Sequence, residues 1–198
     1  MRRWLFVFFS ILPGLTVAAE SIPPEAIPVC YGFGCKTKDT VSISGEEWQQ
    51  VQNWFAGPAA TAEEERTQIQ KAAGWLEVIV GRYTPTHLDL GQDRLDDGYH
   101  GQMDCIDEAN NVTALLNLFE RRGLLKFHRV VEQAYRRTAW DQHWAGQIEE
   151  LSTGKRWVVD SWFQGYGMMP YVPRTTVSAP CVKTKGRYAP KAALTHTT

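Results

Sequence analysis

Residues 100–111 read HGQMDCIDEANN, and this stretch decides the fold because it places a cysteine where a long helix is expected to begin. Apolar residues recur from there at i, i+4, i+7, i+11 and i+14, namely Cys105, Ala109, Val112, Leu116 and Phe119. This spacing predicts an amphipathic helix with the thiol at the N-terminal end of its buried stripe. The run Arg121-Arg122-Gly123 predicts the end of the helix, because cations and a C-cap glycine suit its last turn.

Two further helices are predicted upstream. Ser44 and Glu47 form a capping-box pattern that starts the first helix, and Gly57-Pro58 stops it. The second helix is expected from about Thr61 to Val80, with acidic residues in its first turn, where the helix dipole favours them. Its buried stripe consists of Ile69, Ala72, Ala73, Leu76, Ile79 and Val80.

Beyond Gly123 the pattern changes from helix to strand. Residues 124–134 mix apolar and polar side chains in a strand-like way, and residues 143–151 and 155–163 predict two strands joined by the turn Ser152-Thr153-Gly154. Helices therefore precede an antiparallel sheet. This order predicts an α+β fold in which the third helix packs on the sheet.

The first 19 residues have the features of a secretory signal peptide. Arg2 and Arg3 precede a short apolar core, and the small residues Val17-Ala18-Ala19 suit cleavage before Glu20. The apolar run is too short to span a bilayer comfortably, so no stable membrane anchor is expected, although an uncleaved N-terminal anchor is the alternative. We therefore expect export to the periplasm or secretion.

Composition indicates one domain and no polyanionic partner. Removing residues 1–19 leaves about 179 residues and changes the formal charge from −1 to −3, too small a bias to indicate nucleic acid or anionic membrane. Residues 20–45 are rich in Pro and Gly and are expected to form an extended lead-in segment. The domain is expected to cover residues 46–180, and residues 181–198 are expected to form a loose C-terminal tail.

The four cysteines are Cys30, Cys35, Cys105 and Cys181. An exported chain meets an oxidising compartment, so disulfides are expected. Cys30 and Cys35 are close enough to close a small loop, and Cys181 could instead reach either of them. Cys105 has three interpretations: a nucleophile, a partner of Cys181, or an inert buried thiol.

A thiol at a helix N-terminus acts as a nucleophile when an imidazole forms an ion pair with it and a third group orients that imidazole. His143 and Asp160 are the candidates, and strand alternation places both on one face of the sheet. A tight turn centred on Thr153-Gly154 leaves them four positions apart, or roughly 13 Å. A turn shifted toward Glu150, or a bulge, would bring them opposite each other.

The order of these residues resembles that of the transglutaminase-like cysteine proteinases of bacteria, within the wider papain-like group. The similarity comprises MDC-x-D-E-A on a helix, then His143 in HWAG, then Asp160 in VVD, and it covers roughly residues 46–165. It implies a Cys-His-Asp hydrolase or amide acyl-transferase that acts on a protein or peptide. A non-catalytic module of the same fold, which binds protein or cell-wall peptide, is the alternative.

The resemblance also implies a role for each residue. Cys105 would attack a carbonyl carbon, His143 would take and return the proton, and Asp160 would orient His143. The Cys105 backbone N–H and the Gln102 side chain would donate to the oxyanion. The aromatic residues expected near substrate are Trp140 and Trp162.

No cofactor is expected, with calcium as the one doubtful case. Some members of the family bind calcium through acids that flank the nucleophile. Asp104 occupies one such position, but Ile106 stands where those members carry an acid. Asp104, Asp107 and Glu108 would also oppose thiolate formation, so His143 and the helix dipole must outweigh them.

Overall fold

The computed structural model of this chain describes residues 25–92, 100–137 and 142–175. The expected signal peptide of residues 1–19, Trp140, Cys181 and the expected tail of residues 181–198 therefore lie outside the described residues. The described ranges include the three predicted helices and strands that follow them.

The three predicted helices are present, and each begins at a side chain that caps it. They are α1 (Gly45–Gln52), α2 (Ala62–Val80) and α3 (Cys105–Arg121), with short 3-10 helices η1 (Asn53–Phe55) and η2 (Pro85–Leu88). The Ser44 side chain accepts from the Glu47 N–H in a complete capping box, as predicted, and Thr61 accepts from the Glu64 N–H. Asp104 caps α3, a role that was not predicted from the sequence.

Residues 20–45 are not merely an extended lead-in, because their described part is a β-hairpin that belongs to the core. Strands β1 (Glu25–Tyr31) and β2 (Thr37–Ile43) pair antiparallel, with Glu25 opposite Ile43. Ile27, Val29 and Tyr31 alternate inward and are at most 6% exposed. The prolines concealed this alternation, since Pro28 occupies an outward position of β1.

The second sheet has four antiparallel strands, β3 (His128–Val130), β4 (Ala134–Arg137), β5 (Gln142–Glu150) and β6 (Arg156–Val159). Strand β5 pairs with each of the other three. Gly146 lies opposite Val159, whereas the tight turn assumed from sequence would have placed it opposite Ser161. The centre of the β5–β6 turn therefore lies one residue closer to Glu150 than assumed, a shift that the sequence left open, and the expected register is corrected by two residues.

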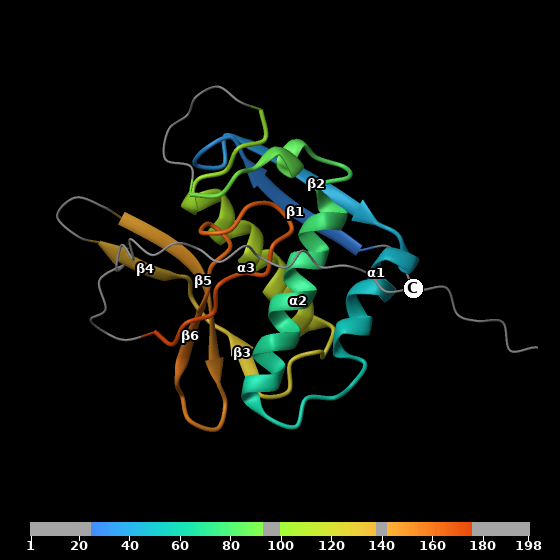
Figure 1. Cartoon of the computed structure of the whole chain (residues 1–198), viewed down its shortest axis with the longest axis vertical. Helices are drawn as coiled ribbons and strands as arrows, with labels where there is room; N and C mark the ends of the chain where they lie inside the picture. The colour runs from blue at the N-terminus through green and yellow to red at the C-terminus, as the bar shows by residue number, and fades with distance from the viewer. Residues whose placement is uncertain (1–24, 93–99, 138–141, 176–198) are drawn as a thin grey trace, which may run out of the picture.

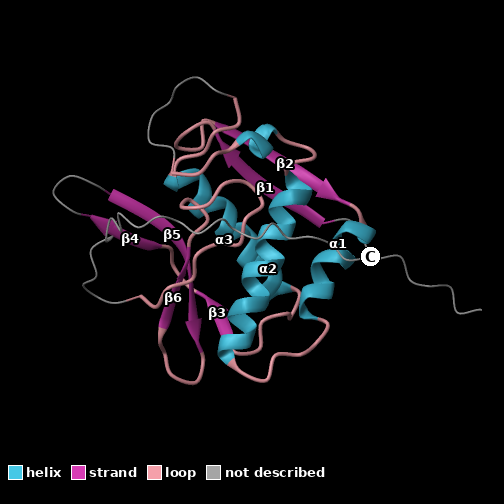
Figure 2. Ribbon diagram, in the orientation of Figure 1, coloured by secondary structure: helices cyan, strands magenta, loops and turns pink. Residues whose placement is uncertain are grey.

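Helix α3 lies between the two sheets, in contact with β1 on one side and β5 on the other (Figures 1 and 2). Helix α2 packs beside α3, which completes an α+β arrangement. The core is continuous across the hairpin, the helices and the sheet. Its fully buried members include Ile43, Trp48, Leu76, Leu116, Phe119, Ile148 and Val159.

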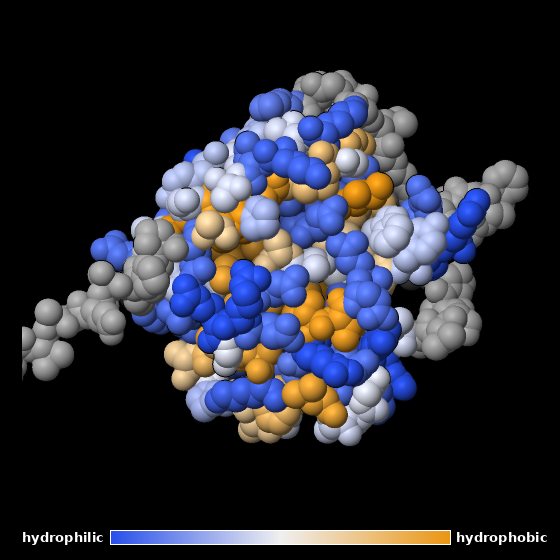
Figure 3. Space-filling view, turned by 180° about the vertical axis from the view of Figure 1, so that it is seen from behind, coloured by the Kyte–Doolittle hydropathy of each residue, from blue (hydrophilic) through white to orange (hydrophobic). Residues whose placement is uncertain are grey.

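On the face opposite to that of Figure 1, apolar side chains lie in separate patches among hydrophilic ones (Figure 3). Within the described ranges, no helix combines the length and the apolar character needed to cross a membrane.

We predict that Gly146→Ala destabilises the protein by about 1–3 kcal/mol, because a side chain there overpacks the α3–β5 interface. A Cβ atom at Gly146 would lie 2.7 Å from Val112 Cγ1 and 3.3 Å from Leu116 Cδ1. The free energy of unfolding in urea measures the effect. Gly57→Ala is the control, because a Cβ atom at Gly57 meets nothing within 4 Å. Equal stability of the two variants would contradict the prediction.

Candidate active site

Cys105 is the first residue of α3 and carries a free, partly exposed thiol. Asp104 Oδ1 accepts the N–H groups of Ile106 and Asp107 at 3.0 and 2.9 Å, which fixes the backbone on either side of the sulfur. Among the described residues, the backbone N–H of Cys105 has no acceptor. The N-terminal end of a helix favours negative charge, so this position suits a thiolate or an anionic intermediate.

His143 lies on β5, where it is 8% exposed. Its Nε2 is 2.6 Å from Asp160 Oδ2, and Cys105 lies close enough to raise the pKa of its imidazole. Because Nε2 is engaged by Asp160, Nδ1 is the ring nitrogen left for the thiol. The three residues expected from sequence are therefore brought together across α3, β5 and the end of β6.

The same contacts change the acidity of the imidazole. Burial alone lowers the pKa of His143, but the hydrogen bonds to Asp160 and Cys105, with their charges, outweigh it and raise that pKa from 6.5 to about 9. His143 is therefore protonated at neutral pH. A protonated imidazole beside a thiol is the arrangement that stabilises a thiolate.

Asp160 directly follows β6 and is held by several backbone contacts. Its N–H and carbonyl pair with Tyr171 at 3.0 and 2.8 Å, and its Oδ1 accepts the Trp162 N–H at 3.2 Å. In the observed register, the position opposite His143 on the β6 side is residue 162, two residues beyond Asp160. The expected register put that position four residues beyond Asp160. The shift of the β5–β6 turn toward Glu150 thus supplies proximity that the expected register lacked.

Two aromatic rings cover His143. The ring centroids of Trp162 and Phe163 lie 5.1 and 5.4 Å from that of His143. Trp162 was expected near substrate, and its 5% exposure makes it a buried wall behind the imidazole. Low dielectric around the His143–Asp160 pair strengthens their attraction. The place of Phe163 was not predicted from the sequence.

Gln102 contacts a neighbouring loop through both ends of its amide. Its Nε2 donates to the Leu88 carbonyl, and its Oε1 accepts the Leu90 N–H at 3.3 Å. Gln102 is 4% exposed. At most one amide hydrogen is therefore left for a substrate oxygen.

Asp104, the calcium candidate, has both oxygens engaged. Its Oδ1 caps α3 and its Oδ2 accepts the Gly34 N–H at 3.0 Å. Across residues 25–92, 100–137 and 142–175, no three His, Cys, Asp or Glu side chains are grouped so that they could hold a metal ion. The donors around Asp104 are N–H groups, so its carboxylate already has compensating partners.

Two acids beside the site, the half-buried Glu77 and the buried Asp89, were not identified from sequence, whereas Glu108 was. Glu77 accepts from Ser161 Oγ at 2.8 Å, and Asp89 Oδ1 accepts the Met103 N–H at 2.8 Å. Glu77 and Glu108 line a cavity of about 30 Å³, which has room for ordered water. The one available signal was Glu77 itself, a lone acid within the apolar run that ends α2.

Burial dominates the acidity of these glutamates. It raises the pKa of Glu77 to about 8, against the lowering effect of the Ser161 hydrogen bond. Burial, with the negative charges of Glu77 and Asp89, raises the pKa of Glu108 well above its usual value. Glu77 therefore holds its proton at neutral pH, and the raised pKa of Glu108 favours its neutral form, which limits the negative charge near Cys105.

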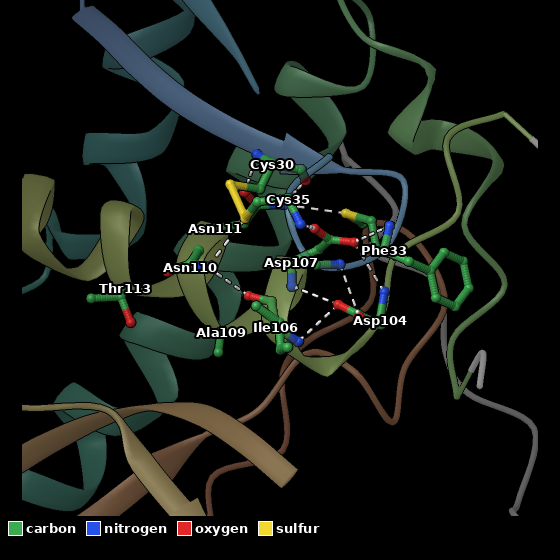
Figure 4. The surroundings of a disulfide bond; sticks show 12 residues. Cys30, Phe33, Cys35, Asp104, Ile106, Asp107, Ala109, Asn110, Asn111 and Thr113 are labelled. Atoms are coloured by element: carbon green, nitrogen blue, oxygen red, sulfur yellow. Dashed lines mark hydrogen bonds between the residues drawn. A yellow bond between two sulfur atoms is a disulfide. The ribbon is translucent and has the colours of Figure 1, made fainter. Parts of the chain in front are cut away.

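Of the pairings left open by the sequence, the structure contains the disulfide between Cys30 and Cys35. The loop that it closes lies against the N-terminal turn of α3 (Figure 4). Comparison of the chain with protein-family models, curated proteins and solved structures finds no match. The site must therefore be interpreted from its own geometry.

We predict that Asp160→Asn lowers the pKa of His143 from about 9 toward 6.5, because the imidazolium loses its anionic acceptor. NMR titration of the His143 ring protons measures this value. Asp39→Asn is the control, since Asp39 accepts a hydrogen bond from Tyr31 in the hairpin. An unchanged His143 titration in Asp160→Asn would show that this carboxylate does not support the imidazolium.

We also predict that the wild-type protein loses stability, relative to Glu77→Gln, as pH rises from about 4.5 to 8. The raised pKa means that the folded state keeps the Glu77 proton up to about pH 8, whereas the unfolded state releases it near 4.5. The stabilisation is thus complete below 4.5 and is lost by the time pH passes 8. Urea unfolding at several pH values measures the difference.

Glu63→Gln provides the matched control for this titration, because Glu63 lies in the exposed first turn of the same helix. A stability difference between wild type and Glu77→Gln that stays constant from pH 5 to 8 would contradict the role assigned to Glu77.

Proposed function

We propose that this protein is an exported transglutaminase-like cysteine peptidase or amide acyl-transferase with a papain-like fold. The observation that carries the proposal is the free thiol of Cys105 at the N-terminus of α3, beside an imidazole that is hydrogen-bonded to Asp160 and whose pKa Cys105 raises. Nucleophile, base and orienting group in this order are the requirements for covalent acyl transfer. The residue pattern of the transglutaminase-like proteinases supports the same assignment.

In the proposed reaction, the Cys105 thiolate attacks the carbonyl carbon of an amide and forms a C–S bond. The carbonyl oxygen becomes an oxyanion, and the Cys105 backbone N–H donates to it. Collapse of this intermediate breaks the C–N bond, and protonated His143 gives its proton to the leaving amine. The product of this half-reaction is a thioester on Cys105.

Water or a second amine then resolves the thioester. His143, now neutral, takes a proton from the acceptor as it attacks, and the Cys105 thiolate leaves. Water as the acceptor gives hydrolysis, whereas a primary amine gives transfer. Asp160 keeps the imidazole oriented with Nε2–H toward its carboxylate throughout.

The proposed substrate is a protein or peptide amide, as the resemblance implies, and the partly exposed thiol leaves the sulfur open to it. Export through the N-terminal signal would place the activity in the periplasm or outside the cell. No cofactor is needed for this chemistry, since each proton and electron pair is supplied by Cys105, His143, substrate and acceptor.

We predict that Cys105→Ser and His143→Ala each lower turnover by about 10³-fold or more, because removing one member of a cooperating set removes the function of the set. Turnover is measured on a panel of fluorogenic peptide amides and denatured casein. Incorporation of a fluorescent primary amine into casein distinguishes transfer from hydrolysis. Iodoacetamide should alkylate Cys105 without prior reduction.

His87→Ala is the matched control, because His87 lies on η2 and bonds to the Thr84 carbonyl. Wild-type protein without turnover on any of these amides would favour the alternative, a binding module of the same fold. A thiol that reacts only after reduction would instead indicate a bridged Cys105.

A further inference from the structure

The turn between Cys30 and Cys35 has an unusual backbone. Gly32, Phe33, Gly34 and Cys35 have φ values of 84°, 65°, 65° and 55°, so four consecutive residues are left-handed. This conformation costs L-residues roughly 1–2 kcal/mol each, and two of the four are not glycine. The Cys30–Cys35 disulfide closes the turn covalently.

The N–H groups of this turn are directed at the acids that flank Cys105. Phe33 and Cys35 donate to the two oxygens of Asp107 at 2.7 and 2.5 Å, and Gly34 donates to Asp104 at 3.0 Å. Figure 4 shows Asp107 pointing from α3 into the turn. Successive N–H groups of this kind form a concave site for an anion, and here the anion is part of the same chain.

Further contacts join the turn to both sides of the nucleophile. The Gly32 N–H donates to the Gln102 carbonyl at 3.0 Å, upstream of Cys105. Downstream, Asn111 exchanges hydrogen bonds with the N–H and carbonyl of Cys30 at 2.7 and 2.8 Å. Asn110 donates to Cys35 Sγ at 3.2 Å. The chain from Gln102 to Asn111 is thus supported along its length.

We propose that the disulfide-closed turn of residues 30–35 is the positioning element for Cys105, so that the proposed activity depends on the Cys30–Cys35 disulfide. The dependence of activity on the disulfide rests on the proposed function. The positioning of Cys105 does not, because it concerns only where the sulfur lies relative to His143. The first turn of α3 has the sheet on one side and this turn on the other, and loss of either support lets the sulfur move relative to the imidazole.

Asp107 is the positioning residue that transmits this support. It is fully buried, and it accepts the N–H groups of Phe33, Cys35 and Asp104. Opening the turn would leave this carboxylate buried without two of its donors. A buried acceptor that loses its partners is costly, so the helix end would rearrange to recover them.

The test replaces both Cys30 and Cys35 with Ser. The pKa of His143 should fall from about 9, because one of the contacts that raises it is the hydrogen bond to Cys105. Alkylation of Cys105 by iodoacetamide at pH 7 should slow by about 10- to 100-fold, and kcat should fall similarly with less change in KM. A purely structural disulfide would lower the melting temperature without moving the His143 titration.

Asp39→Ala is the matched control, because it removes the hydrogen bond from Tyr31 in the same hairpin and lies outside residues 30–35. It should leave the His143 titration and the alkylation rate unchanged. Treating wild-type protein with a dithiol, which reduces the disulfide to two thiols and is itself oxidised to a disulfide, should reproduce the effect of the double replacement.

A folded double-serine variant with wild-type His143 titration and alkylation rate would overturn the proposal. Where that variant does not fold, Asp107→Asn decides, because it keeps the disulfide and removes one of the two acceptor oxygens. It should lower the His143 pKa and slow alkylation, and unchanged values would equally overturn the proposal. If wild-type protein shows no turnover while the variants still show these changes, the proposed function is wrong and the positioning role of the turn stands.

Discussion

The packing of α3 between a β-hairpin and a four-stranded sheet is the constraint on which the candidate site depends. A helix that packs on one surface can slide or tilt, whereas a helix packed between two surfaces is held from both sides. Gly146 allows β5 to approach Val112 closely, and the hairpin contacts α3 from the opposite side. Cys105 therefore has a defined position relative to His143, although the two residues come from different layers.

Electrostatic balance in this region is achieved with few cations. The acids around Cys105 are compensated by backbone N–H groups at Asp104 and Asp107, by protonation at Glu77 and by the raised pKa of Glu108. The charged partner of Asp160 is the imidazolium of His143. A thiolate at the N-terminus of α3 would thus meet a protonated imidazole and largely neutralised acids, which is the condition that the proposed chemistry requires.

The helices were predicted well because their signals are local. The Ser44–Glu47 capping box and the apolar stripe from Ile69 to Val80 both lie within a few turns of sequence, and each is present in the structure. The hairpin of β1 and β2 was missed because prolines and glycines were taken as evidence of an extended lead-in. In fact Pro28 faces outward and the glycines form the left-handed turn.

The candidate site was predicted in composition but not in geometry. Strand alternation placed His143 and Asp160 on one face, because the side-chain period of a strand is a local property. Their separation depended on the position of the β5–β6 turn in the sequence, and the observed register is two residues from the expected one. Phe163 and Asp89 carry no local signal that marks them as neighbours of Cys105.

The amino-acid sequence by itself thus determined the helices, the α+β order and the residues with the right chemistry, because propensity, capping and periodicity act over a few residues. Only the tertiary structure decided which cysteines pair, how far His143 lies from its partners, and which buried acids surround the thiol. Those features depend on contacts between segments such as residues 30–35 and 102–111, about seventy positions apart. Long-range packing of this kind is not encoded in any short pattern.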